Sequence, residues 1–84
     1  MKKLWQFEWD DSYALIGGIF KATDEEIQNL IGKNISLGEA SGKHSEVYGI
    51  VEEGDIMLIS DNPIVVDEMV EFGYNPLNYI YEED

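Results

Sequence analysis

Lys43, His44 and Ser45 stand together in a stretch rich in glycine and serine, and these residue types could do chemistry. A histidine beside a serine could supply the base and the nucleophile of a hydrolase, with the lysine completing a polar cluster. Side chains adjacent in sequence rarely aim at each other as such a site requires, and no glycine-framed nucleophile turn surrounds the serine. We therefore expect no enzyme, and a small hydrolase using the His44 loop is the least favoured function.

Carboxylates near turns are the second candidate for chemistry. Glu52, Glu53 and Asp55 flank one turn, and Asp10 adjoins Asp11, so either group could bind a hard cation through its oxygen atoms. Neither group has the spacing of a calcium-binding loop, and the chain has no cysteine for a thiolate metal site. We expect no metal and no cofactor.

The glycine pair Gly17-Gly18 could let a phosphate approach the backbone. It lacks the later glycines and the basic residue of phosphate-binding loops. The pair interrupts the segment from Tyr13 to Ala22, which is apolar on both faces and typical of a central strand. We interpret the glycines as the site of a β-bulge or bend in that strand.

Charge is distributed very unevenly along the chain. The 84 residues have a net charge of −13, and residues 44–84 contain eleven acids but no Lys or Arg, whereas residues 1–43 contain seven acids and all five lysines. Direct binding to DNA, RNA or an anionic membrane needs cations that neutralise phosphate, and five lysines without arginine supply too few. The expected partner is a basic protein surface, with no direct nucleic-acid contact.

Periodicity and capping signals predict the elements of the first half. Residues 4–9 alternate as a half-buried strand does, with its aromatic residues facing inward. Thr23 and Glu26 have the spacing of a helix capping box, and Gly32 is placed to end that helix. A short strand is expected over residues 34–39.

The second half is expected to begin with a hairpin. Residues 46–52 and 55–60 are apolar runs separated by Glu53-Gly54, a pair close to those of tight turns, so we predict that the two strands pair with each other. Asn62-Pro63 then predicts the start of a helix that runs to Phe72 and buries one apolar face. Asn75-Pro76 repeats this device and predicts a further helical turn.

The element order is therefore β-β-α-β-β-β-α, with connections mostly too short for parallel crossovers. This order predicts an α+β fold, a small two-layer sandwich of one mainly antiparallel sheet of about five strands and two short helices, in a single domain over residues 1–84.

No apolar run reaches the length of a membrane span or a signal peptide, so we expect a cytoplasmic protein. The predicted core is Trp5, Phe7, Ile16, Phe20, Ile27, Leu30, Val47, Leu58, Val66 and Met69.

Partner binding is assigned to acids without a capping role and to aromatic residues near the chain end. Asp67, Glu68 and Glu71 should be neighbours on one helix, about 5–6 Å apart. Tyr79 and Tyr81 could supply apolar anchors, with at least one of them partly exposed. The predicted partner-binding residues are Glu52, Glu53, Asp55, Asp67, Glu68, Glu71, Tyr79 and Tyr81.

In bulk composition the chain resembles small acidic inhibitors, often phage-encoded, that imitate nucleic acid and occupy the basic groove of a restriction, CRISPR or repair protein. Duplex DNA presents one negative charge per ~1.7 Å of axis, so such a decoy needs closely spaced, uncompensated carboxylates on a rigid support. The alternative is a small structural or adaptor domain whose acidity serves solubility only. The sequence leaves monomer and homodimer both open.

The charge distribution generates a first prediction. Unscreened acids that lie within a Debye length repel one another in the folded state, so moderate salt should stabilise this fold. We expect the melting temperature, followed by circular dichroism, to rise as sodium chloride is raised from a very low concentration. A melting temperature that falls over this range contradicts the expectation.

Overall fold

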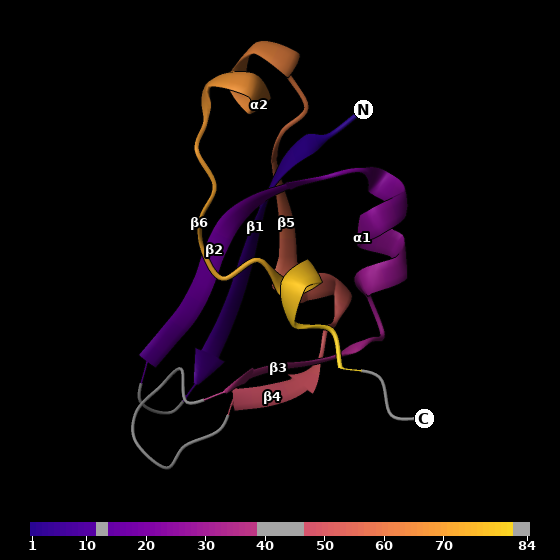
Figure 1. The fold of residues 1–84 in the computed structure, drawn as a ribbon, viewed down its shortest axis with the longest axis vertical. Helices are drawn as coiled ribbons and strands as arrows, with labels where there is room; N and C mark the ends of the chain where they lie inside the picture. The colour runs from indigo at the N-terminus through magenta and orange to yellow at the C-terminus, as the bar shows by residue number, and fades with distance from the viewer. Residues whose placement is uncertain (12–13, 39–46, 82–84) are drawn as a thin grey trace.

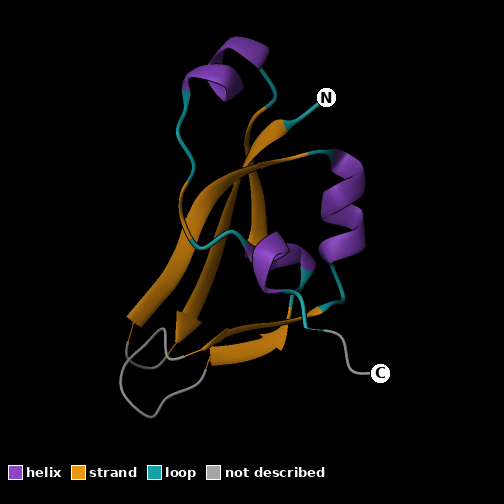
Figure 2. Ribbon diagram, viewed as in Figure 1, coloured by secondary structure: helices purple, strands orange, loops and turns teal. Residues whose placement is uncertain are grey.

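The computed structural model describes residues 1–11, 14–38 and 47–81. The chain has an α+β fold in which all strand pairs are antiparallel, so the predicted class is confirmed (Figure 1). A four-stranded sheet has the order β5 (Ile56–Ser60), β1 (Lys3–Asp11), β2 (Ala14–Ala22) and β6 (Phe72–Gly73), and a separate two-stranded sheet pairs β3 (Asn34–Gly38) with β4 (Val47–Ile50). Of the two α-helices, α1 (Asp24–Leu30) lies alongside the larger sheet and α2 (Pro63–Glu68) lies at the end of that sheet (Figure 2).

The elements occur in the following order. The first four are β1 (Lys3–Asp11), β2 (Ala14–Ala22), α1 (Asp24–Leu30) and β3 (Asn34–Gly38). They are followed by β4 (Val47–Ile50), the 3-10 helix η1 (Glu53–Asp55), β5 (Ile56–Ser60), α2 (Pro63–Glu68), β6 (Phe72–Gly73) and the 3-10 helix η2 (Pro76–Tyr79).

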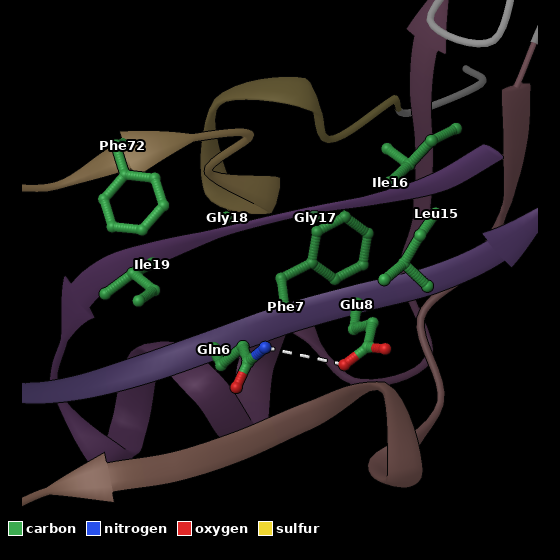
Figure 3. Close-up of a pocket in the computed structure, with 9 residues that line it drawn as sticks. All are labelled: Gln6, Phe7, Glu8, Leu15, Ile16, Gly17, Gly18, Ile19 and Phe72. Atoms are coloured by element: carbon green, nitrogen blue, oxygen red, sulfur yellow. Dashed lines mark hydrogen bonds between the residues drawn. The ribbon is translucent and has the colours of Figure 1, made fainter.

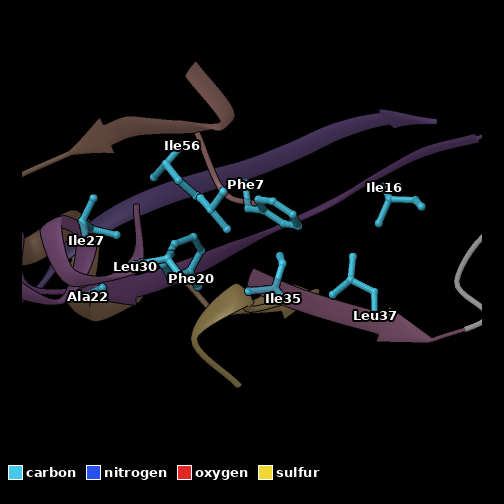
Figure 4. Packing of buried hydrophobic residues seen from close by; sticks show 10 residues of the cluster. Phe7, Ile16, Phe20, Ala22, Ile27, Leu30, Ile35, Leu37 and Ile56 are labelled. Carbon is cyan, nitrogen blue, oxygen red and sulfur yellow. The ribbon is translucent and has the colours of Figure 1, made fainter. Parts of the chain in front are cut away.

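The core lies between one face of the larger sheet and a layer made by α1 and β3 (Figure 4). Phe7 and Phe20, from the two paired strands β1 and β2, are fully buried at its centre. Helix α1 adds Ile27 and Leu30, and β3 adds Ile35 and Leu37 from its inward face as predicted. The cluster is Phe7, Ile16, Phe20, Ala22, Ile27, Leu30, Ile35, Leu37, Val51 and Ile56.

Helix α1 begins and ends where its capping residues predict. The hydroxyl oxygen of Thr23 accepts a hydrogen bond from the Glu26 amide at 3.1 Å, and the Glu26 carboxylate accepts one from the Thr23 amide at 2.9 Å. The hydrogen bond from the Thr23 backbone lowers the pKa of Glu26. Gly32, with φ of 91°, adopts the left-handed conformation expected just past a helix.

The predicted hairpin between residues 46–52 and 55–60 is wrong. Strand β4 pairs with β3, whereas β5 pairs with β1 and places Ile56 opposite Phe7. The Glu53-Gly54 segment forms a 3-10 turn, closed by a 3.0 Å hydrogen bond from the Asp55 amide to the Glu52 carbonyl, which carries the chain from one sheet to the other. Val51 is fully buried, and its amide donates a hydrogen bond to the Lys33 carbonyl. These tertiary interactions outweigh the local preference of Glu53-Gly54 for a tight hairpin turn.

Of the bulge or bend predicted at Gly17-Gly18, the bulge is wrong, because the register between β1 and β2 is unbroken. The glycines instead admit β6, which places Gly73 opposite Gly18. A Cβ atom on Gly18 would lie 2.5 Å from the Phe72 carbonyl oxygen, and Gly73 has φ of 76°. The register shift falls between β1 and β5, at Leu4 and Trp5.

Helix α2 is shorter than predicted. Its start is confirmed, since the Asn62 side chain accepts a 2.9 Å hydrogen bond from the Ile64 amide. The helix ends at Glu68 and not at Phe72, because the chain must extend to join the edge of β2. Val66 is therefore the one buried residue of α2. The further turn predicted after Asn75-Pro76 is present as η2.

Most of the predicted core is confirmed. Trp5 and Val47 are half-buried against the core, whereas Leu58 and Met69 are exposed and were wrongly assigned to it. Leu58 lies on the outermost strand of the sheet, and Met69 follows the shortened helix. Leu4, expected on the outward face of β1, is fully buried where α2 packs against that strand. Phe7, Ile16, Phe20, Ile27, Leu30 and Val66 are buried as predicted.

The close approach of β6 to β2 generates a second prediction. Gly18→Ala should lower the free energy of unfolding by about 1–3 kcal/mol, because a methyl group there overlaps the β6 backbone. For a domain of this size each kcal/mol lowers the melting temperature by roughly 4–8 °C. Gly54→Ala is the matched control, since no atom lies within 4 Å of the added methyl group. Equal melting temperatures for the two variants would contradict the packing described.

Candidate partner-binding surface

Strand β5 is an outer strand of the larger sheet. It pairs with β1 on one side, and no strand among residues 1–11, 14–38 and 47–81 pairs with its other side. Its five residues include no charged side chain. Ile56 is buried, but Met57, Leu58 and Ile59 are 57%, 49% and 44% exposed. The strand therefore presents apolar side chains together with backbone groups that pair with no described strand on that side.

Apolar side chains remain exposed beyond the strand. Ile64 on α2, Val70 after it and Phe72 on β6 are more than half exposed, because the short helix turns only Val66 into the protein. The docking segment, defined here as residues 57–72, also contains four acids and no Lys or Arg. Its exposed large apolar residues are Met57, Leu58, Ile59, Ile64, Val65, Met69, Val70 and Phe72.

The acids predicted before β5 differ in their roles. Glu52 and Glu53 are exposed at the 3-10 turn. Asp55 is half-buried, and its Oδ2 atom accepts hydrogen bonds from the Trp9 indole at 2.8 Å and from the Glu52 amide at 2.9 Å. Asp55 thus ties the turn to β1, and its carboxylate has a structural role that the sequence did not indicate.

The acids predicted after β5 do not form one helical row. Asp67 and Glu68 are exposed in the last turn of α2, where the helix dipole disfavours negative charge and no basic residue compensates it. Glu71 lies beyond the end of the helix. Its Oε2 atom accepts hydrogen bonds from the Lys21 amide at 3.0 Å and from the Asn75 side chain at 3.5 Å. The expected spacing of the three acids on one helix is therefore wrong.

Tyr79 and Tyr81 belong to the segment of η2 and the residues after it, which lies beside β3. Figure 1 shows this C-terminal segment, in yellow, away from α2. The Tyr79 ring makes an edge contact with Tyr74 at 5.7 Å, and the Tyr81 amide donates to the Asn34 carbonyl at 2.7 Å. Both tyrosines are partly exposed as expected, at 36% and 54%. The structure brings Glu52 and Glu53 to one end of β5 and Asp67 and Glu68 beyond its other end, but it does not bring the tyrosines to α2.

Two shallow depressions lie on the outward face of the sheet and share Gln6 and Glu8. The first, of about 210 Å³, is mostly apolar and is lined by Leu15, Ile19 and Phe72 among others (Figure 3). The second, of about 230 Å³, adjoins β5 and is lined by Gln6, Glu8, Asp10, Gly54, Asp55 and Met57. Its three carboxylates face no basic side chain in that lining. Within the described ranges no three potential ligands converge on a metal position.

Sequence reasoning missed the exposed apolar residues around these depressions. Met57 alternates with the buried Ile56, so strand periodicity could have placed it on the outward face once β5 was paired with β1. The exposure of Phe72 had no such signal, since it depends on the early end of α2. The Lys43-His44-Ser45 cluster and the acidic residues 82–84 lie outside the described residues.

Few acids of the described segments are compensated by a cation. One ion pair joins two described residues, between the Lys3 Nζ atom and an Asp24 carboxylate oxygen at 2.8 Å. This hydrogen bond raises the pKa of Lys3.

No helix in the described part of the chain is long and apolar enough to cross a membrane.

No family model, no curated protein and no solved structure matches this chain.

The two roles of the acids around η1 generate a third prediction. Asp55→Ala should lower the free energy of unfolding by about 1–3 kcal/mol, because it leaves the Trp9 indole and the Glu52 amide without their acceptor. Glu53→Ala removes an equal charge from an exposed site and should change stability little. Chemical denaturation with tryptophan fluorescence measures both variants. If Glu53→Ala destabilises as much as Asp55→Ala, the structural role of Asp55 is wrong.

Proposed function

We propose that this protein is a non-enzymatic acidic module that binds a basic surface of a partner protein. The main support is the coincidence, within the docking segment, of exposed apolar side chains with the exposed carboxylates of Asp67 and Glu68, which no basic residue in their helical turn compensates. Protein interfaces commonly join an apolar centre, which provides affinity, to a polar or charged rim. Charges at the rim mainly speed encounter and select a partner of opposite sign.

The exposed apolar residues favour binding over a purely solubilising role for the acids. A surface shaped for solubility intersperses charge and limits apolar patches. Here Ile64 and Val70, on α2 and just after it with Asp67 and Glu68, are 68% and 77% exposed, and Phe72 on β6 is 60% exposed. A partner that binds these acids could therefore also cover exposed apolar side chains. We place the apolar anchor on them, since Tyr79 and Tyr81 lie beside β3.

The finer form of the proposal is an inhibitor that imitates nucleic acid, so that the partner's basic surface is one that normally holds DNA or RNA. Its support is that two exposed acidic pairs, Glu52-Glu53 and Asp67-Glu68, lie beyond opposite ends of β5. A strand of five residues is roughly 17 Å long, so the two pairs could meet separate basic patches. Because α2 ends at Glu68, the acids Asp67, Glu68 and Glu71 do not form the closely spaced row on one helix that was expected of a nucleic-acid decoy.

A fourth prediction follows from this proposal. Glu68→Lys and Glu53→Lys should each weaken binding to a partner captured from the native host, because each places a cation against a basic surface. Glu25→Lys, on the exposed first turn of α1, makes the same change in net charge away from the docking segment and should have a smaller effect. Dissociation constants measured by calorimetry at several salt concentrations provide the comparison.

The outcomes separate the two forms of the proposal. A partner that is not basic, or affinity that does not change with salt, would show that the acidic-module proposal is wrong. A basic partner whose binding is unaffected by an excess of nucleic acid would leave that proposal standing and reject the imitation of nucleic acid.

A further inference from the structure

The geometry of β5 points to a specific mode of docking: an extended segment of the partner pairs with the free side of β5 and adds a fifth strand to the sheet. The added segment carries Lys or Arg on both sides of its paired residues. This inference rests on the proposed function and specifies how the basic partner is held.

The backbone of β5 has the hydrogen-bonding capacity that strand addition needs. In an antiparallel pair, alternate residues direct their N–H and C=O groups toward the partner strand, and the residues between them direct theirs away. Apart from the pairing with β1, the structure gives no backbone hydrogen bond from Ile56–Ser60 to another described residue. An added strand would satisfy these groups, which is the basis of peptide recognition by strand addition.

Outer strands are commonly protected by Lys, by Pro, by an inward-pointing charge, by a β-bulge or by extreme shortness. Strand β5 has one of these features, the register shift that leaves Ile59 without a partner on β1, so the regular part that an added strand would pair with is Ile56, Met57 and Leu58. None of the residues Ile56-Met57-Leu58-Ile59-Ser60 is charged or proline. On the opposite side of the sheet, β6 is only two residues long and offers little backbone for pairing.

The side chains of β5 present apolar contacts on both faces. Met57 lies opposite Gln6 on the outward face, and Leu58 lies opposite Trp5 on the inward face; both are about half exposed. Apolar side chains of an added strand would pack beside them as cross-strand neighbours. Met57 also lines the depression with Glu8, Asp10 and Asp55, where a basic side chain of the added segment would meet carboxylates.

Charge decides between a basic partner and a second copy of this chain. Acidic residues flank β5, with Glu53 before it and Asp61 after it; Lys3 of β1 interacts with Asp61, and residues 44–84 contain no Lys or Arg. If two copies paired antiparallel about Leu58, Asp55 of one would lie opposite Asp61 of the other. Like charges opposed across a strand pair are destabilising, and two chains of net charge −13 repel. A segment flanked by Lys or Arg meets the same acids favourably.

The probe for this inference is a synthetic peptide of alternating valine and threonine with lysines at both ends. Binding should slow hydrogen exchange at amides within residues 56–60. Methylating the backbone nitrogens along one side of the peptide keeps its charge and side chains but removes its donors, and should weaken binding at least about tenfold. A peptide with glutamates in place of the lysines should not bind, and Glu53→Lys should weaken the lysine peptide more than Glu25→Lys does.

Each contrary result overturns strand addition at β5. These results are no binding of the lysine peptide, equal binding of the methylated peptide, or protection from exchange at β4 and not at β5. Salt-sensitive capture of a basic host protein in spite of such a result would leave the proposed function intact and reject only this docking mode. Peptide binding as expected, without any basic partner in the host, would instead count against the proposed function.

Discussion

The backbone contact between β2 and β6 determines the path of the second half of the chain. Gly18 and Gly73 lie opposite each other, and the Tyr74 amide donates to the Gly17 carbonyl at 3.1 Å. Because this contact requires extended backbone at Phe72, it ends α2 early and leaves Phe72 on the surface. It also directs η2 toward α1 and β3, where Pro76 is buried. Which side chains of the docking segment are exposed therefore depends on a close approach between the backbones of β2 and β6, and only glycine permits that approach.

Strand β1 links the core to the docking segment. Its inward face contributes Phe7 to the core, while its outward face carries Gln6 and Glu8 into both depressions. Pairing with β2 on one side and β5 on the other leaves β5 as an outer strand. The same pairing that builds the core thus exposes the apolar residues of β5, and the acids that flank them favour a basic partner over self-association.

Two groups of carboxylates in the described segments differ in their physical roles. Those of Glu26, Asp55 and Glu71 accept hydrogen bonds from backbone amides and hold a helix start, a turn and the segment before η2. Those of Glu53 and Glu68 are exposed and accept no hydrogen bond from a described residue in the structure. Substitution of the first group disturbs folding, so only the second can report on binding. Net charge by itself does not distinguish the two groups.

The sequence by itself determined the features that depend on neighbouring residues. Helix starts at Thr23 and Asn62 and the turn at Gly32 were predictable because their hydrogen bonds or backbone angles involve residues only a few positions apart. Tertiary structure alone decided the pairing of β5 with β1 and the roles of Asp55 and Glu71. The acceptors Asp55 and Glu71 lie 46 and 50 positions from Trp9 and Lys21, the residues that donate to them. Local patterns carry no information about such distant partners, because burial of the whole core selects them.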